Sequence, residues 1–147
     1  MTDPTMNISA AARLCGLSAK TIRHYEAIGL LAPAQRTQAG YRQYNQRSIE
    51  QLGFIHHARA LGFSIAQVSN LLALKDNPQR ASRAVKALAQ QQLSELEHRM
   101  QELARMQAML KDMISRCAGD DDPHCVILEK LAEPETAENA DEQNQTD

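Results

Sequence analysis

The chain has 147 residues, which suffices for one ordinary domain or for a small domain with an extension. Aromatic residues make up only 3% of it and tryptophan is absent, a composition that favours helices packed by aliphatic side chains over a β-sandwich. No apolar run approaches the ~18 residues of a membrane span and no secretory leader is visible, so we expect a cytoplasmic protein.

The formal net charge of -2 conceals two regions of opposite sign. Residues 1–62 carry seven Lys or Arg against three Asp or Glu, a balance of +4. Residues 132–147 carry six acids and no base, and they contain almost nothing to bury. We therefore expect a front region that suits a polyanion and a disordered acidic tail.

Residues 6–75 begin with the pattern of two short helices joined by a tight turn. Asn7 or Ser9 is placed to cap the first helix, Gly16 to end it, and Ser18 to cap the second. Apolar residues recur at helical spacing on both sides of the turn. These are the dimensions of a helix-turn-helix, although many helical hairpins share them.

The next segment, RTQAGYRQYNQRS, interleaves tyrosines with arginines around a glycine. Its alternation predicts a two-stranded wing with Tyr41 on one face and with Arg42 and Tyr44 on the other. Cationic and hydroxyl groups at this density are what phosphate contacts require. The alternative is a solvated loop whose tyrosines pack on the core.

Two further helices are predicted at about 48–61 and 64–74, and a linker at 76–81 leads to a longer one. Residues 82–116 contain neither glycine nor proline, which predicts a single helix far longer than average. Its apolar residues recur in steps of four and three, a heptad seam typical of a coiled coil. A helix about 50 Å long would extend beyond so small a domain, so we favour a homodimer over packing on the chain's own helices. The predicted seam comprises Leu93, Leu96, Met100, Leu103, Leu110 and Ile114.

Two of the three cysteines, Cys117 and Cys125, enclose the loop AGDDDPH. In a reducing compartment such a pair is more often a metal or redox site than a structural disulfide. Two thiolates are soft ligands, which select Cu(I), Zn(II) and similar ions over Mg(II) or Ca(II). Asp122 is placed to cap a short helix starting at Pro123, which would put Cys125 in its first turn and favour the thiolate.

Together, the segment MNISAAARLCGLSAKTIRHYEAIGLL, the wing GYRQY, the long helix and the cysteine loop resemble the MerR family of transcriptional regulators. The loop and the apolar residues after it are similar to the copper-efflux-regulator (CueR) branch. The resemblance implies a mainly α protein: a winged helix-turn-helix DNA-binding domain, a long antiparallel coiled-coil dimerisation helix and a C-terminal metal-binding loop. The expected boundaries are a leader at 1–5, the DNA-binding domain at 6–75, the linker at 76–81, the dimerisation helix at 82–116, the loop with its short helix at 117–131, and the tail at 132–147.

The resemblance also implies a transcriptional activator and no enzymatic activity. Its homodimer would bind palindromic double-stranded promoter DNA and distort it so that RNA polymerase can engage, with no membrane partner. The residues implied for the major groove are Lys20, Thr21, Arg23 and His24, and those implied for phosphates are Tyr41, Arg42, Tyr44 and Arg59.

The effector implied by the resemblance is Cu(I), with Ag(I) and Au(I) as alternatives, held by Cys117 and Cys125. Ser82 stands where divalent-metal members of the family carry a third cysteine, which favours a monovalent ion. We expect Ser82 and His124 to lie near the ligands without binding the metal. Two alternatives stay open: His124 could complete a Zn(II) or other divalent site, and a Cys117–Cys125 disulfide could sense oxidants.

Overall fold

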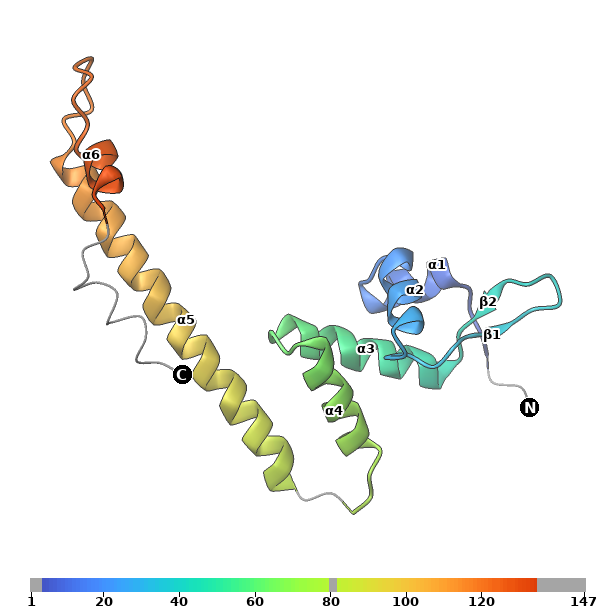
Figure 1. The fold of residues 1–147 in the computed structure, drawn as a ribbon. Coiled ribbons are helices and arrows are strands. Elements are labelled where there is room, and N and C mark those ends of the chain that lie inside the picture. The colour runs from blue at the N-terminus through green and yellow to red at the C-terminus, as the bar shows by residue number, and fades with distance from the viewer. Residues whose placement is uncertain (1–3, 80–81, 135–147) are drawn as a thin grey trace. The chain divides into compact units, whose positions relative to one another are not determined.

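The computed structural model describes residues 4–79 and 82–134, and the predicted acidic tail lies almost entirely outside them (Figure 1). The described residues are mostly helical, with a small antiparallel sheet, as predicted. The chain divides into two compact units, and the boundary along the chain lies between Gln92 and Leu93. Within the described part of the chain, no helix is both long and apolar enough to cross a membrane.

The first unit opens with the predicted helix-turn-helix, α1 (Ile8–Cys15) and α2 (Ala19–Ala27). The side chains of Asn7 and Ser18 cap the two helices by accepting backbone N–H groups from the first turn of each. Gly16 ends α1 with a φ of 68°, a left-handed conformation that glycine adopts without a Cβ penalty. The caps and the helix break predicted from the sequence are confirmed.

The predicted wing is present but short, with strands β1 (Gln35–Arg36) and β2 (Arg42–Gln43). The two strands are antiparallel, and a tight turn with Gly40 at a φ of 88° joins them. Beyond β2, the backbone of Tyr44 pairs with Met6, which brings the start of the chain alongside the wing. This pairing turns Tyr44 into the core.

Two more helices, α3 (Gln46–Ala60) and α4 (Ile65–Lys75), complete the predicted DNA-binding region. Asn45 caps α3, so this helix begins two residues earlier than predicted, and Ser64 caps α4. These helices enclose an apolar core, against which Val85 and Leu88 of the next helix also pack. The most deeply buried side chains of this core are Tyr44, Ile22, Leu31, Leu52, Ile55 and Val68.

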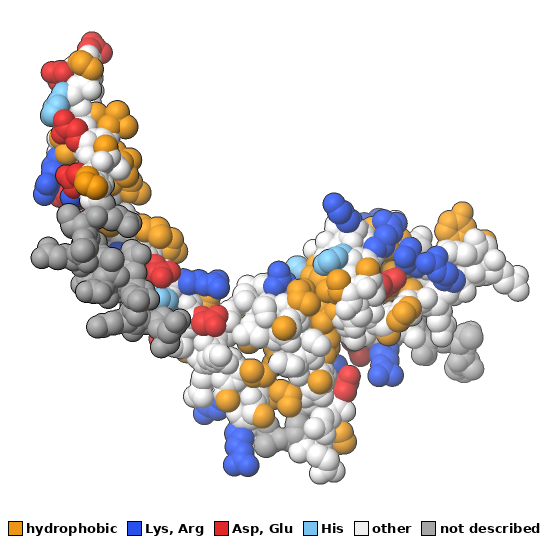
Figure 2. Space-filling view, in the orientation of Figure 1, with side chains coloured by type: hydrophobic (Ala, Val, Ile, Leu, Met, Phe, Trp, Pro, Cys, Tyr) orange, Lys and Arg blue, Asp and Glu red, His pale blue; other side chains and the backbone are white. Residues whose placement is uncertain are grey.

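Helix α5 (Ser82–Arg116) has the predicted bounds. Hydrophobic side chains follow one side of it (Figure 2). All six residues of the predicted seam are exposed in the single chain, by between 37% and 69% of their surface. This exposure is consistent with a helix that pairs with a second copy of itself. The antiparallel arrangement of the two helices stays a prediction.

The short helix α6 (Val126–Ala132) begins later than predicted. The Asp122 carboxylate accepts the backbone N–H of His124 at 3.0 Å, and this local turn competes with a helical start at Pro123. Cys125, with φ -132° and ψ 111°, is therefore the residue before the helix and not part of its first turn. The predicted capping role of Asp122 was wrong, because its side chain closes a turn upstream of the helix.

Candidate DNA interface and metal site

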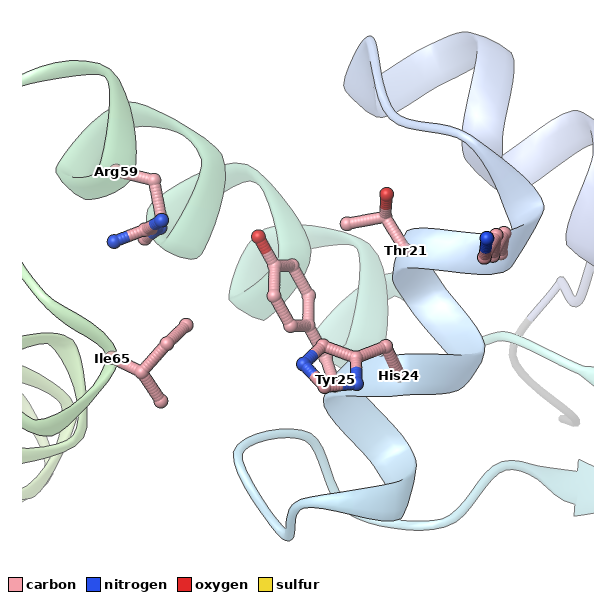
Figure 3. Close-up of a pocket in the computed structure, with 6 residues that line it drawn as sticks. Thr21, His24, Tyr25, Arg59 and Ile65 are labelled. Atoms are coloured by element: carbon pink, nitrogen blue, oxygen red, sulfur yellow. The ribbon is translucent and has the colours of Figure 1, made fainter.

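A shallow cavity of about 320 Å³ lies over the outer face of α2. It gathers Lys20, Thr21 and His24 of α2 with Arg59 of α3, four of the residues implied for DNA contact. Figure 3 shows the α2 side chains on one side and Arg59 across from them. Two segments distant in sequence thus supply cationic and hydroxyl groups to one surface, as phosphate binding requires.

Two further residues line this cavity that sequence reasoning did not assign to it, Tyr25 and Ile65. Tyr25 is only 6% exposed, and its ring forms part of the cavity (Figure 3). Its helical spacing with Ile22 predicted that Tyr25 is a core residue. This spacing concerns α2 alone, so it could not show that α3 and α4 leave one edge of the ring accessible. Arg23 is exposed on the same helix but does not line the cavity.

A partly buried ionic cluster connects α2 to the wing. Glu26 accepts a hydrogen bond from the Tyr44 hydroxyl and forms an ion pair with Arg42 at 3.1 Å. Tyr44 is completely buried, and burial, together with the neighbouring Glu26, raises the pKa of its hydroxyl. The expectation that Tyr44 contacts phosphates was therefore wrong, because its side chain has no accessible surface.

The other two wing residues predicted to contact phosphates, Tyr41 and Arg42, differ in how exposed their side chains are. Tyr41 is 72% exposed near the tip of the wing, where it can reach a ligand. Arg42 keeps 27% of its side chain exposed while it is paired with Glu26. Lysine and arginine side chains are nevertheless abundant over the helix-turn-helix part of this unit (Figure 2).

The two loop cysteines flank the segment between α5 and α6. Cys117 directly follows α5, and its backbone N–H still donates to the Met113 carbonyl at 3.2 Å. Cys125 directly precedes α6. Both are free, partly exposed thiols, and Cys117 lies close enough to Cys125 to lower the pKa of its thiol. The predicted pair is thus brought together within one chain.

The start of α6 favours the ionised form of Cys125. The backbone N–H of Leu128 lowers the pKa of the Cys125 thiol most, and the N–H of Ile127 and Cys117 also lower it. Desolvation and the negative charge of Glu129 oppose them with smaller effects than that of Leu128. Cys125 therefore obtains the stabilisation expected of a first-turn cysteine from its place just before the helix. A thiolate is the form that binds a soft metal ion.

The polar residues of the loop act mainly on its backbone. Asp120 and Asp122 each accept a backbone N–H two residues further on, at 3.1 and 3.0 Å. His124 pairs through Nδ1 with Glu129 at 3.0 Å, and both side chains are more than half exposed. Among residues 4–79 and 82–134, no three His, Cys, Asp or Glu side chains are grouped to hold a metal ion. Within one chain, the cysteine pair thus lacks a third protein ligand among the described residues.

Comparison with known proteins establishes the family. Residues 6–75 match the family model described as MerR HTH family regulatory protein, and residues 49–113 match the one described as MerR, DNA binding. This chain belongs to the MerR family. The expectation of a transcriptional regulator, and not an enzyme, is confirmed by this membership.

Individual relatives are similar over most of their length. A probable heavy metal-dependent transcriptional regulator of Haemophilus influenzae is 47% identical over 126 residues, which cover 86% of this chain and 98% of the relative. The HTH-type transcriptional regulator CueR of Vibrio cholerae is 40% identical over 126 residues, covering 86% and 91%. Among solved structures, the transcription regulator PbrR691 of Ralstonia metallidurans CH34, in complex with lead(II), has a TM-score of 0.74 and 28% identity, covering 86% of this chain and 99% of that one.

Ser82 is the remaining site residue that the MerR resemblance singled out. It begins α5, whereas Cys117 follows the last residue of this helix. A helix of 35 residues is about 50 Å long, so Ser82 and Cys117 of one chain cannot share an ion. A role for Ser82 near the metal therefore requires a second copy of the chain.

The Glu26 cluster predicts a difference between the two wing tyrosines. We expect Tyr44→Phe to lower the free energy of unfolding by about 1–2 kcal/mol, because it removes a buried hydrogen bond to a carboxylate. The matched control Tyr41→Phe alters an exposed side chain and should change stability by less than about 0.5 kcal/mol. Urea denaturation followed by circular dichroism measures both. Equal effects of the two substitutions would contradict the assignment.

The thiol environments predict different alkylation profiles in the metal-free protein. The lowered pKa of Cys125 gives it a larger thiolate fraction at neutral pH, so its reaction with iodoacetamide should reach half its maximal rate at a lower pH than that of an ordinary peptide thiol. Burial raises the pKa of Cys15, which should react last. Mass spectrometry of peptides quenched at successive pH values measures each rate. A Cys125 profile that coincides with that of a free peptide thiol would refute the prediction.

Proposed function

We propose that this protein is a dimeric activator of transcription that senses Cu(I) and turns on genes for copper efflux or detoxification. The observation that carries the proposal is the pair of thiols at Cys117 and Cys125, one with a lowered pKa, without a third grouped ligand in the described residues. The names of the relatives support it: one is called heavy metal-dependent and another CueR, and PbrR691 was solved with lead(II).

The cysteine pair fits a monovalent d10 ion, which accepts two ligands, better than an ion that requires four ligands in a tetrahedron. Cu(I), Ag(I) and Au(I) accept two sulfurs in a line, whereas Zn(II) in proteins takes four ligands. Two thiolates with one Cu(I) would carry a net charge of -1. The backbone N–H groups of Ile127 and Leu128 already favour negative charge on Cys125 and would continue to do so. Bound Cu(I) would supply a bridge between the two ends of the loop.

The DNA-binding half of the proposal rests on the α2 face and on the seam of α5. Lys20, Thr21 and Arg59 form a surface suited to phosphates, and α2 is positioned as the reading helix of a helix-turn-helix. Pairing of two α5 seams would present two such helices, which matches a palindromic promoter with half-sites about one helical turn apart. Distorting that promoter for RNA polymerase costs on the order of several kcal/mol, which offsets the contacts that the distorted DNA gains. The equilibrium between undistorted and distorted promoter is then nearly balanced, and the effector need only shift it.

A second candidate, a Zn(II)-responsive regulator, is favoured by one observation. Glu129 accepts from Nδ1 of His124, and a carboxylate on one ring nitrogen is how proteins orient a histidine whose other nitrogen binds zinc. His124 adjoins Cys125 in sequence, so a movement of the loop or a partner chain could complete such a site.

X-ray absorption of the reduced protein, titrated anaerobically with Cu(I) and separately with Zn(II), tests the proposal. We expect two short sulfur bonds per Cu(I) and weak zinc binding. Tight four-coordinate zinc with nitrogen among its ligands would overturn the Cu(I) assignment and make His124 a ligand. A transcriptional response to oxidant with all metal chelated would instead indicate a thiol redox sensor.

A further inference from the structure

A buried glutamine on α5 is not explained by packing alone. Gln92 is only 3% exposed, and its Nε2 donates to the carbonyl of Leu61 at 3.0 Å. Its Oε1 is buried without a hydrogen-bond partner among the described residues. A leucine would fill the same space but would leave the Leu61 carbonyl without this donor. The amide therefore makes a bond to the turn between α3 and α4 that no apolar side chain could make.

That turn is shaped to receive the amide. Gly62 follows Leu61 and has a φ of 88°, which favours glycine. A Cβ at Gly62 would lie 2.6 Å from Gln92 Nε2, so any other residue would displace the amide. The glutamine and the glycine thus fit each other across two elements that are 30 positions apart in sequence.

The same turn is tied to the predicted DNA face from its other side. Arg59 Nη1 donates to the Phe63 carbonyl at 2.8 Å. Arg59 also lines the cavity over α2, beside Lys20 and Thr21. A continuous series of contacts therefore runs from Gln92 through the turn to Arg59, and all of it lies within the first compact unit.

Helix α5 extends without a break from Gln92 to the residue before Cys117. We propose that Gln92 is a positioning residue, whose bond to Leu61 fixes α5 to the α3–α4 turn and thereby sets how the DNA-binding unit is presented to two half-sites. The inference rests on the proposed function, because it requires a dimer on a two-site promoter. It adds a point of control that belongs neither to the cysteine loop nor to the reading helix.

The test compares Gln92→Met with the matched control Gln91→Met. Methionine has nearly the length of glutamine but cannot donate a hydrogen bond, and Gln91 is the exposed neighbour on the same helix. Metal-free protein is titrated with a promoter duplex that carries both half-sites, identified by footprinting of the wild type, and with the same duplex after one half-site is scrambled. We expect Gln92→Met to weaken binding to the two-site duplex about tenfold or more and to leave one-site binding unchanged, because only simultaneous engagement depends on presentation. Gln91→Met should match the wild type on both.

Equal weakening on both duplexes, or no weakening on either, would overturn the positioning role. Gln92→Glu, with Gln91→Glu as its control, gives an independent second test, because a carboxylate also cannot donate to Leu61. A wild type that prefers the two-site duplex but does not bind Cu(I) would remove the metal assignment and leave the inference standing. A wild type without two-site preference would overturn the dimeric function and the inference with it.

Discussion

Replacing either loop cysteine by serine is expected to abolish Cu(I)-dependent activation and to leave DNA binding intact. A serine hydroxyl is a hard, protonated donor at neutral pH, so Cys117→Ser or Cys125→Ser leaves a single soft ligand. We expect Cu(I) affinity to fall more than ~100-fold, a larger effect than removal of a group that only supports a ligand. Competition with a chromogenic Cu(I) chelator measures affinity, and in vitro transcription with and without Cu(I) measures activation.

The third cysteine provides the control. Cys15 is buried in the core of the first unit, where its S–H contacts the Ile49 carbonyl at 3.8 Å. Cys15→Ala should keep the Cu(I) stoichiometry and the transcriptional response, and lower the free energy of unfolding by about 1 kcal/mol. If the loop variants lost promoter binding, or if Cys15→Ala lost the metal response, the division of roles between the cysteines would be contradicted.

The features that could be predicted from sequence are those fixed by local chemistry. Asn7, Ser18 and Gly16 set the bounds of the first two helices because capping and left-handed turns depend on a few neighbouring residues. The long helix was predicted to the residue, since 82–116 lacks both glycine and proline. The cysteine pair stood out because the chain has only three cysteines and two of them flank one short loop.

The errors arose where distant segments decide the outcome. Alternation placed Arg42 and Tyr44 on one face of the wing, and both do reach Glu26, but no local pattern showed that this face packs against α2 and buries the Tyr44 ring. Tyr25 was assigned to the core alone. Its place in the cavity could not be predicted from its own helix, because Arg59 of α3 and Ile65 of α4 form the rest of the cavity wall. The Gln92 contact to Leu61 joins residues 31 positions apart, and no local pattern identified it.

A charged residue in the exposed seam of α5 is expected to have the second large effect, the loss of the dimer. Leu103→Glu is expected to convert the dimer to monomers, because each pairing would bury two carboxylates without partners. Glutamate is a good helix former, so α5 itself should persist. The penalty should be about 4 kcal/mol or more, a ~1,000-fold rise in the dimer dissociation constant. Light scattering after size-exclusion chromatography measures the oligomeric state.

A methionine on the same helix separates the seam from general surface effects. Met109 is 59% exposed, close to the 63% of Leu103, but it lies outside the predicted heptad positions. Met109→Glu should therefore remain dimeric and bind promoter DNA as the wild type does. Leu103→Glu should bind the two-site promoter ~100-fold more weakly, because each monomer then reads one half-site alone. If both variants remained dimeric, the apolar side of α5 would have another partner, and the heptad interpretation of the seam would be wrong.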